Sequence, residues 1–537
     1  MDEPDPYCSL VLSRLRDAHD TLHFQPQLQL LEGKTKRIDW EKIKKAGDEL
    51  TRLKIIGMAA EIYDYAGKYD HARAVVEADG RLTENILRDE SQLQSTKDKD
   101  RELLKQRVWI LIHWGSTFYR AHNYVRARQL FSLCNETLGK WVITEEKPCS
   151  WTQARIYYCL GLVQRQIYDY KQARHWFTKS IELAGKSFVQ RTHNITSEQP
   201  IYQRTKLFTD YYVAKLLALG MAWTYYTEGA LDLAASLVDT ARLLLTSTRE
   251  VVIRSYIEIL SASILAARGQ RQKAIKLFQG AYDALKDHEA YRIRAANELA
   301  VAYVHEYFRE PGEENLSNAR KYINEVSESR DRRWQCNALV TESRLFRALG
   351  QYKEAEESAT KALHLGEDQR FIRIDAGIAR GEARLELNKI NDACKDFTGA
   401  LSDGLDNRKV QAVCHLHLAR AYLLKHEHAL ALRHKDEANQ HVGHVDNAFV
   451  RNLADTVETT IKTSAGTDLY VSISQTTMDP WEQEAKLHGF LTEWARRQPG
   501  NENEPWKVLG ISKQTFYNWR AEKAKLNAET TKPKLAE

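Results

Sequence analysis

The chain has 537 residues, of which 43% are hydrophobic and 28% charged, a balance that excludes wholesale disorder. It contains only 25 glycines and 10 prolines, which disfavours a turn-rich β fold and favours long helices. A net charge of +5 is too small for this length to indicate a nucleic-acid or membrane surface by itself.

Two features of the sequence bear on where in the cell the protein is located, the N-terminus and the cysteines. The opening residues, MDEPDPYCSL, lack the basic start and apolar run of an export signal, and no later stretch approaches the ~18 apolar residues of a membrane span. The seven cysteines form no C-x-x-C pair. We therefore expect a cytoplasmic protein with reduced thiols and no membrane contact.

Residues 1–50 are predicted to be helical, because Leu10, Leu12, Leu15, Ile43 and Leu50 recur at mixed helical spacing. A helical array needs a terminal unit that covers its exposed apolar face. We therefore interpret 1–50 as an N-terminal helical cap.

Residues 51–463 repeat one pattern, in which a small residue, an aromatic residue and a turn precede Tyr-x-x-Ala and a large apolar residue. In 111–131 the pattern consists of Gly115, Phe118, Tyr124, Ala127 and Phe131. It recurs fully or in part in 157–177, 219–241 and 339–362. Two antiparallel helices approach closely only where one presents a small residue to a large residue of the other, so the pattern predicts helical hairpins.

Several hairpins have a glycine just before the second helix, at Gly67, Gly229, Gly269 and Gly350. Glycine suits the left-handed residue that ends a first helix. The corresponding glycine is missing near His122, Tyr168, Asn388 and His426.

This pattern resembles the tetratricopeptide repeat. The resemblance implies an all-α solenoid of about nine hairpins whose inner groove binds a protein or peptide. The marker alanines lie roughly 36 to 61 residues apart, whereas the family period is ~34. The array is therefore predicted to be irregular, with long helices and a polar loop near 186–205. A generic α-solenoid with the same packing is the alternative.

Motifs of catalysis and cofactor binding are missing from the sequence. Gly185-Lys186-Ser187 lacks the earlier glycine of a phosphate loop and follows a predicted helix, so we interpret Gly185 as a helix C-cap. No dinucleotide fingerprint, nucleophile elbow or H-E-x-x-H sequence occurs. We predict a protein that is not an enzyme, with no catalytic residue and no cofactor.

Seven histidines gather in or just after the last hairpin: His415, His417, His426, His428, His434, His441 and His444. A metal site is the less favoured interpretation, because His415 and His417 lie two residues apart on a helix and point to different faces. Solvated or interfacial histidines are favoured, and we predict no metal.

Arginines near the small residues of the first helices are candidates for a peptide-binding groove. They are Arg155, Arg165, Arg344, Arg347 and Arg420. In tetratricopeptide proteins this position lines the inner groove, so the resemblance implies recognition of acidic peptide segments by charge-assisted hydrogen bonds. An ordinary solvated face is the alternative.

The C-terminal part begins with a Ser/Thr-rich stretch, 464–480, which is predicted to be a linker. Residues 481–498 then show the apolar spacing of an amphipathic helix. In 504–526, Gly510 suits a tight turn, Ile511 fills the angle between two helices, and Ser512 caps the second helix.

The segment 504–526 resembles the helix-turn-helix of transposase-type and Fis-type DNA-binding proteins, and 481–526 is therefore treated as one module followed by a flexible tail, 527–537. The resemblance implies DNA contact by Ser512, Lys513, Gln514, Tyr517, Asn518, Arg520 and Lys523. The alternative is a helical cap that docks on the solenoid through Trp481, Trp494, Trp506 and Trp519.

The leading hypothesis is a protein-binding scaffold coupled to a DNA-binding module, as in a transcription regulator. The alternative is a pure interaction scaffold or chaperone-adaptor without nucleic-acid binding. An enzyme assembled across the solenoid is the least favoured. The identity of the partner and the oligomeric state do not follow from the sequence.

Overall fold

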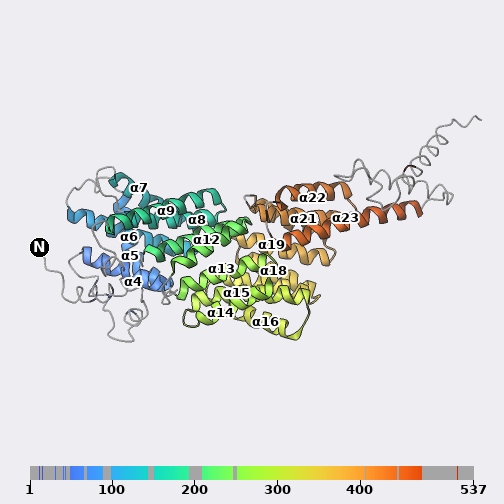
Figure 1. The fold of residues 1–537 in the computed structure, drawn as a ribbon, viewed down its shortest axis with the longest axis horizontal. Coiled ribbons are helices and arrows are strands. Elements are labelled where there is room, and N and C mark those ends of the chain that lie inside the picture. The colour runs from blue at the N-terminus through green and yellow to red at the C-terminus, as the bar shows by residue number, and fades with distance from the viewer. Residues whose placement is uncertain are drawn as a thin grey trace, which may run out of the picture. The chain divides into compact units, whose positions relative to one another are not determined.

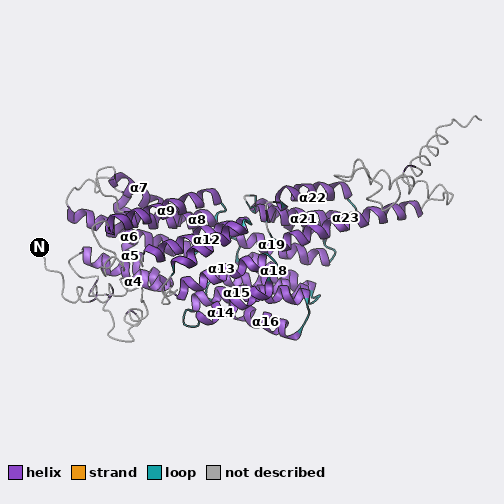
Figure 2. Ribbon diagram, in the orientation of Figure 1, coloured by secondary structure: helices purple, strands orange, loops and turns teal. Residues whose placement is uncertain are grey.

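The computed structural model describes residues 49–65, 69–88, 98–142, 150–192, 209–245, 251–405, 407–443, 445 and 447–474, with residues 11, 15, 31, 40, 43 and 517. Helices and short turns make up these ranges, and no strand occurs within them (Figure 2). They belong to two units, 1–415 with 438–451 and 416–437 with 452–537. None of the described helices is long and apolar enough to cross a bilayer.

Consecutive helices form nine pairs in the described chain (Figure 1). They are α4 (Glu49–Tyr65) with α5 (Tyr69–Arg88), α6 (Asp98–Arg120) with α7 (Tyr124–Val142), α8 (Ser150–Gln166) with α9 (Tyr170–Thr192), η2 (Leu216–Ala222) running into α11 (Trp223–Glu228) with α12 (Leu231–Leu244), α13 (Val251–Ala267) with α14 (Arg271–Ala284), α15 (Glu289–Arg309) with α16 (Glu313–Ser327), α17 (Arg332–Ala348) with α18 (Tyr352–Leu365), α19 (Arg370–Glu386) with α20 (Ile390–Asp403), and α21 (Arg408–Leu424) with α22 (His428–Val442). A further helix, α23 (Ala448–Ser474), follows. The all-α solenoid predicted from the repeat is confirmed.

Small-to-large packing holds the two helices of a hairpin together. A Cβ atom added at Gly161 would lie 2.6 Å from the ring of Phe177, and one added at Gly115 would lie 2.6 Å from the ring of Phe131. Phe177 also fills a gap in the next hairpin, where a Cβ at Gly220 would lie 2.9 Å away. The phenylalanine ring therefore packs against glycine both within its hairpin and across to the neighbouring one.

Three of the four predicted turn glycines adopt the left-handed conformation, and the fourth, Gly67, lies outside the described residues. Gly229, Gly269 and Gly350 have φ of 89°, 85° and 75°. The four units without a turn glycine adopt the same conformation with other residues, at His122 (φ 62°), Tyr168 (φ 66°), Asn388 (φ 58°) and His426 (φ 59°). A non-glycine residue in the left-handed conformation is disfavoured by about 1–2 kcal/mol. Side-chain contacts can offset this cost.

The first helices of successive hairpins contact one another, as in the pairs α4 with α6, α15 with α17, and α17 with α19. Fewer such contacts join the second helices; α5 with α7 is an example. Helices on the concave side of a curved stack lie closer together than those on the convex side. We therefore call the layer of first helices the inner layer.

The stack curves until early hairpins touch late ones within the first unit. His122 Nε2 lies 3.3 Å from Asp331 Oδ1, and Arg370 Nη1 donates to the carbonyl oxygen of Ile167 over 2.9 Å. Asn407 Nδ2 donates to the hydroxyl of Tyr170 over 3.0 Å. The turns of the second and third hairpins thus contact the N-terminal ends of α17, α19 and α21. Hairpins that are far apart in the sequence therefore lie together in the first unit.

These contacts explain two of the four missing turn glycines. The imidazole of His122 contacts Asp331, and the guanidinium of Arg370 lies 4.8 Å from the ring centroid of Tyr168. Glycine at either position would relieve backbone strain but would remove a contact between distant hairpins.

We expect opposite effects from glycine at two strained turns. Asn388→Gly should raise the free energy of unfolding by up to about 1 kcal/mol, because glycine accepts a positive φ at lower cost. His122→Gly should lower the free energy of unfolding, because the contact with Asp331 is lost. Thermal unfolding followed by circular dichroism measures both variants. Shifts of the same sign would show that the His122 side chain contributes nothing to the fold.

Two helices extend beyond their predicted ends. Helix α9 continues to Thr192, so residues 186–192 of the predicted loop are helical and Gly185 lies inside the helix and not at its cap. Buried Ser180, Ala184 and Ser187 continue the spacing of the packed face. Helix α23 continues to Ser474, so residues 464–474 of the predicted linker are helical. A glycine inside a helix costs only about 1 kcal/mol, which the rest of a long helix offsets.

Four described residues of the N-terminal region, Val11, Leu15, Leu31 and Ile43, are buried, and Trp40 is half-buried. Leu15 and Ile43 are fully covered and pack in one cluster with Ile55 and Ile62 of α4. This burial is what a cap over the first hairpin requires.

Candidate functional site: cations of the inner layer

Two of the five groove arginines proposed from the sequence are ion-paired. Arg155 of α8 lies 2.5 Å from Glu61, and its guanidinium is 4.7 Å from the ring centroid of Trp109. Arg347 of α17 lies 3.2 Å from Glu382. Because each positive charge already has a carboxylate partner, neither is positioned to neutralise a ligand.

Arg165 and Arg344 have no ion pair with any described carboxylate. Arg165, at the end of α8, donates to the carbonyl oxygen of Leu219 in the next hairpin. Arg344 lies in α17, and both side chains are half-buried. Arg420 belongs to the second unit, is half-buried and has contacts of its own.

Arg294 of α15 comes from three hairpins further along the chain and lies near Arg165. Its guanidinium stacks 3.9 Å from the ring centroid of Trp223 and 5.2 Å from that of Tyr256. Arg165 and Arg294 therefore both contact the first helix of the fourth hairpin, at the carbonyl of Leu219 and at the ring of Trp223.

Arg333, in the first turn of α17, completes this group. Its guanidinium lies 4.3 Å from the ring centroid of Trp334. Burial lowers the pKa of Arg294, and the positive charges of Arg333 and Arg165 lower it further, against the opposite effects of Tyr256 and Glu298.

Some donor atoms of this group meet no acceptor. The Nε atoms of Arg294 and Arg333 are buried and have no hydrogen-bond partner in the protein. A buried donor without an acceptor costs about 1–3 kcal/mol. The Nε atoms of Arg52 and Arg347, both ion-paired, are buried without a partner as well, so this feature does not distinguish the group.

Two more charged residues extend the group along the inner layer. Lys409, in the first turn of α21, has no ion pair with a described carboxylate. Burial lowers the pKa of Lys409, and the charge of Arg344 lowers it further, whereas the charges of Asp375 and Glu298 raise it. Burial raises the pKa of Glu298, while the charges of Arg294 and Lys409 oppose that rise.

We call Arg165, Arg294, Arg333, Arg344 and Lys409 the cation face. Glu298, Asp375 and Asp331 are carboxylates that interact with its members through charge, so five cations stand against three carboxylates among these described residues. Arginines elsewhere are commonly paired, for example Arg384 with Glu356 at 2.8 Å and Arg292 with Glu325 at 3.1 Å. The members of the cation face have no ion pair with a described carboxylate, and they are half-buried, whereas unpaired cations such as Arg320 and Lys361 are exposed.

Sequence reasoning missed Arg294, Arg333 and Lys409 because it considered only arginines near the small residues that mark the repeat. A signal was present in the first turns of α17 and α21, which contain Arg332, Arg333, Arg408 and Lys409. The helix dipole disfavours cations at a helix N-terminus. The same dipole adds to the positive potential that an anion meets there.

Removing the buried ammonium of Lys409 is expected to stabilise the fold. Lys409→Met keeps the aliphatic stem and removes a charge that lacks an ion pair, so the free energy of unfolding should rise by about 1 kcal/mol. Chemical denaturation measures the change. The matched control is Lys361→Met on the exposed side of α18, which should change it by less than about 0.5 kcal/mol. A loss of stability in Lys409→Met would mean that the ammonium makes favourable interactions within the folded protein.

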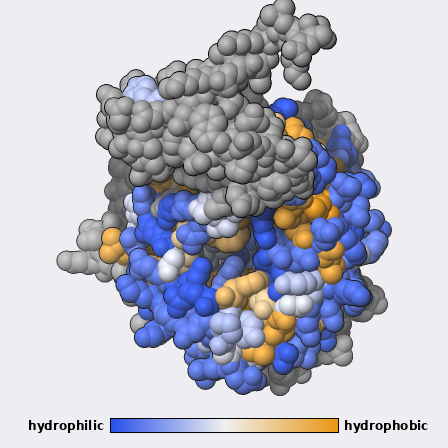
Figure 3. All heavy atoms as spheres, turned by 90° about the vertical axis from the view of Figure 1, so that its right-hand side faces the viewer, coloured by the Kyte–Doolittle hydropathy of each residue, from blue (hydrophilic) through white to orange (hydrophobic). Residues whose placement is uncertain are grey.

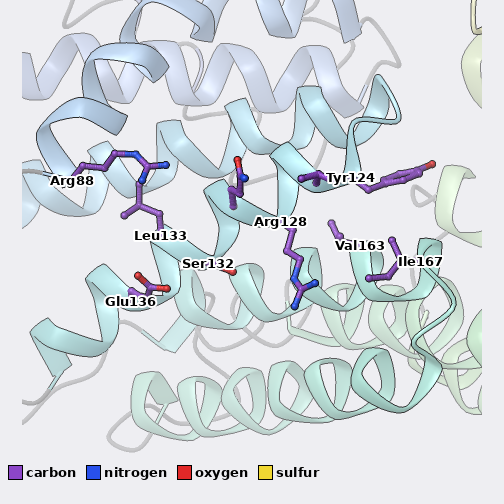
Figure 4. A pocket seen from close by; sticks show the side chains of 10 residues that line it. Arg88, Tyr124, Arg128, Ser132, Leu133, Glu136, Val163 and Ile167 are labelled. Carbon is purple, nitrogen blue, oxygen red and sulfur yellow. The ribbon is translucent and has the colours of Figure 1, made fainter. Parts of the chain in front are cut away.

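A surface cleft of about 580 Å³ lies along α7 (Figure 4). Its lining residues are Arg88, Tyr124, Val125, Arg128, Gln129, Ser132, Leu133, Glu136, Val163 and Ile167. Arg88 and Glu136 lie at one end and Tyr124, Val163 and Ile167 at the other (Figure 4). Arginines of both the predicted groove and the cation face are missing from this lining, so the cleft is a separate feature.

The outer surface is mostly polar. On the face drawn in Figure 3, hydrophilic residues predominate among the coloured atoms, and hydrophobic residues form groups between them. Large apolar side chains that protrude from the described chain include Leu233 and Leu405, which are 54% and 60% exposed. Scattered apolar side chains of this kind are normal on a soluble surface and identify no docking site.

The residues proposed for DNA contact lie outside the described chain, except Tyr517, which is helical and 46% exposed. His444, one of the seven clustered histidines, also lies outside the described chain. Within the second unit, His434 stacks on Tyr422 with ring centroids 5.3 Å apart, and its Nδ1 atom lies 3.2 Å from Glu437. The preference for solvated or interfacial histidines and the absence of a metal both stay predictions.

No protein-family model and no curated protein matches the chain. Solved structures do match. A tetratricopeptide repeat protein from Parabacteroides merdae is 13% identical over 55% of this chain and 97% of its own, with a TM-score of 0.34. A Rap protein complexed with competence and sporulation factor is 12% identical over 67% and 99%, with a TM-score of 0.39. A human IFIT1 dimer with PPP-AAAA is 14% identical over 78% and 99%, with a TM-score of 0.35. The hairpins of the chain itself establish its fold.

Proposed function

We propose that the protein is a scaffold whose inner layer holds a negatively charged segment of a partner protein. The observation that carries this proposal is the cation face, where half-buried arginine and lysine side chains have no carboxylate partner. Buried cations without counterions cost stability and are retained where they serve binding. An acidic segment would supply the missing counterions and accept hydrogen bonds from the guanidiniums.

The form of the segment follows from the layout of the cation face. Its members come from α8, α15, α17 and α21, so the positive charge is distributed over several hairpins. An extended peptide can place successive carboxylates opposite successive helices, whereas a small anion satisfies only one place. We therefore favour a peptide segment with several aspartate or glutamate residues.

Binding of a fluorescent peptide library tests this proposal. Alternate positions of the library are Asp or Glu and the others are random, and a matched library has Asn or Gln at the acidic positions. The full chain should bind the acidic library and not the neutral one, with an affinity that falls as salt rises. Equal binding of both libraries would contradict recognition by charge.

The second part of the proposal concerns DNA. The resemblance of 504–526 to a helix-turn-helix supports contact of duplex DNA by Lys513, Gln514, Asn518 and Arg520, which would couple partner binding to a site on DNA. The pure scaffold or chaperone-adaptor is the competing function. It would have the same inner layer and no affinity for DNA.

Electrophoretic mobility shift with the full chain separates these two functions. The chain should bind duplex DNA at low salt, and Lys513→Ala with Arg520→Ala should weaken that binding by about tenfold or more. Arg320→Ala with Lys361→Ala, two exposed cations of α16 and α18, is the matched control. Binding that is unchanged in the first double variant, or absent in the wild type, would favour the pure scaffold.

A further inference from the structure

Helix α7 presents one regular line of residues on the side that faces away from the core. Its other side is buried through residues such as Phe131 and Cys134. The line consists of exposed or half-buried residues at intervals of three, four, four and three positions: Val125, Arg128, Ser132, Glu136 and Gly139. Residues three or four positions apart are neighbours on one face of a helix. These five residues, the α7 line, therefore form a continuous face with Ser132 at its centre.

The α7 line contains two charges that lack a partner in the described chain. Arg128 and Glu136 are exposed, and neither side chain forms an ion pair or a hydrogen bond with another described residue. The nearby carboxylate of Glu84 on α5 is already shared by Arg88 at 2.9 Å and Arg126 at 2.5 Å. Both charges of the line are therefore available to a partner.

The charges of the α7 line are complementary to those of a reversed copy of the line. When two copies of one helix pack antiparallel about a two-fold axis at Ser132, residues equally far from Ser132 on either side lie opposite each other. Arg128 lies four residues before Ser132, and Glu136 lies four residues after it. Arg128 of each copy is then opposite Glu136 of the other, so both symmetric contacts are attractive.

The ends of the α7 line are complementary in size. Val125, seven residues before Ser132, is 72% exposed. Gly139, seven residues after it, has open space, because a Cβ atom added there meets no atom within 4 Å. In the antiparallel pair, Val125 of each copy lies over Gly139 of the other, and the small Ser132 lies at the axis. A large residue against a small one lets two helices approach closely.

A cleft on the same side of α7 leaves room for the side chains of a second helix. Val125, Arg128, Ser132 and Glu136 belong to the lining of the cleft of about 580 Å³ (Figure 4). A purely acidic segment would match Arg128 and be repelled by Glu136, and a purely basic segment would do the reverse. A second copy of the line offers the opposite charge at both positions, so it is the occupant that the charges favour.

We infer that a second copy of the chain binds along the α7 line, in a two-fold symmetric dimer whose contact is α7 against α7. The inference goes beyond the proposed function, because the α7 line and the cation face share no residue. One helix pair buries less surface than the roughly 1,200–2,000 Å² of a stable interface, so the dimer should form reversibly at micromolar concentrations. Such a dimer has two inner layers and can hold two partner segments at once.

Analytical ultracentrifugation of the full chain tests the dimer. Between about 1 and 100 μM, the average mass should rise from the 62.0 kDa of one chain towards twice that value. Arg128→Glu and Glu136→Arg should each weaken the dimer at least about tenfold, because each reversal places like charges at both symmetric contacts. Lys361→Glu, a reversal at an exposed position of α18, is the matched control and should leave the dimer unchanged. Circular dichroism verifies that each variant is folded.

A mixture of the two single variants tests the pairing itself. Each variant alone has charges of one sign at positions 128 and 136. A pair of one Arg128→Glu chain with one Glu136→Arg chain has opposite charges at both contacts, so the mixture should form dimers although neither variant does so alone. The double variant Arg128→Glu with Glu136→Arg should regain the dimer for the same reason.

Three results would overturn the inference and leave the proposed function standing. The first is a wild-type mass that stays at one chain up to about 100 μM. The second is a dimer that neither reversal weakens, since its contact then lies elsewhere. The third is a mixture that stays monomeric although both single variants have lost the dimer. A monomeric wild type whose affinity for the acidic peptide library falls in Arg128→Glu would assign the cleft to a partner segment instead.

Discussion

Phe177→Ala is expected to lower the local free energy of unfolding by about 3–5 kcal/mol, the largest effect on stability that we predict. The ring is fully buried and packs against Gly161 in its own hairpin and Gly220 in the next. Neither glycine has a side chain that could move into the space left by the ring, so the cavity would stay open.

Hydrogen exchange measures this effect where it is predicted to occur. In a solenoid, each hairpin contacts mainly its neighbours, so the loss of protection should centre on α8, α9 and η2 and leave α17 and α18 little changed. Leu243→Ala is the control, because Leu243 of the adjoining α12 is 81% exposed. Uniform loss of protection over the whole array would contradict the view that the hairpins are held together by local small-to-large contacts.

Arg333→Glu with Arg344→Glu is expected to weaken binding of the acidic peptide library at least about a hundredfold. The double reversal turns two attractive charges of the cation face into repulsive ones, and a like-charge contact in a partly desolvated site costs several kcal/mol. The fold should persist, because a carboxylate is favourable in the first turn of α17 and because a carboxylate at position 344 would offset the charge of Lys409. Isothermal titration calorimetry measures the affinity.

A matched double reversal controls for the change in net charge. Arg320→Glu with Lys361→Glu changes the same number of charges on exposed positions of α16 and α18. This control variant should lower the affinity for the peptide only slightly, because its charges act over a long distance. The reduction should be smaller still at high salt, which screens such charges. Equal loss of affinity in the two double variants would mean that the total charge of the protein, and not the cation face, attracts the peptide.

The hairpins could be predicted from the sequence because their causes are local. Gly161 and Phe177 lie sixteen residues apart, and the turn residue between them follows from the same short segment. The ends of α9 and α23 could not be predicted as well, because polar residues such as Ser187 and a single Gly466 read as loop although a long helix tolerates them.

The cation face could be predicted only in part, because it depends on contacts between distant hairpins. Arg165 and Arg344 were candidates from the sequence, and so were Arg155 and Arg347. The two pairs are distinguished only by the ion pairs of Arg155 with Glu61 and of Arg347 with Glu382. Nothing in the local sequence around Arg165 indicates that Arg294 and Arg333 lie near it. That proximity follows from the curvature of the stack, which His122 and Asp331 hold.

The central claim is that a partner segment binds along the inner layer, and site-specific photo-crosslinking tests it most directly. A benzophenone amino acid in place of Tyr256, beside Arg294, should capture the acidic peptide library, and the same amino acid in place of Leu233, on the exposed side of α12, should not. Capture at Tyr256 should disappear in Arg333→Glu with Arg344→Glu. Capture at Leu233 alone, or at both positions regardless of those substitutions, would contradict binding on the inner layer.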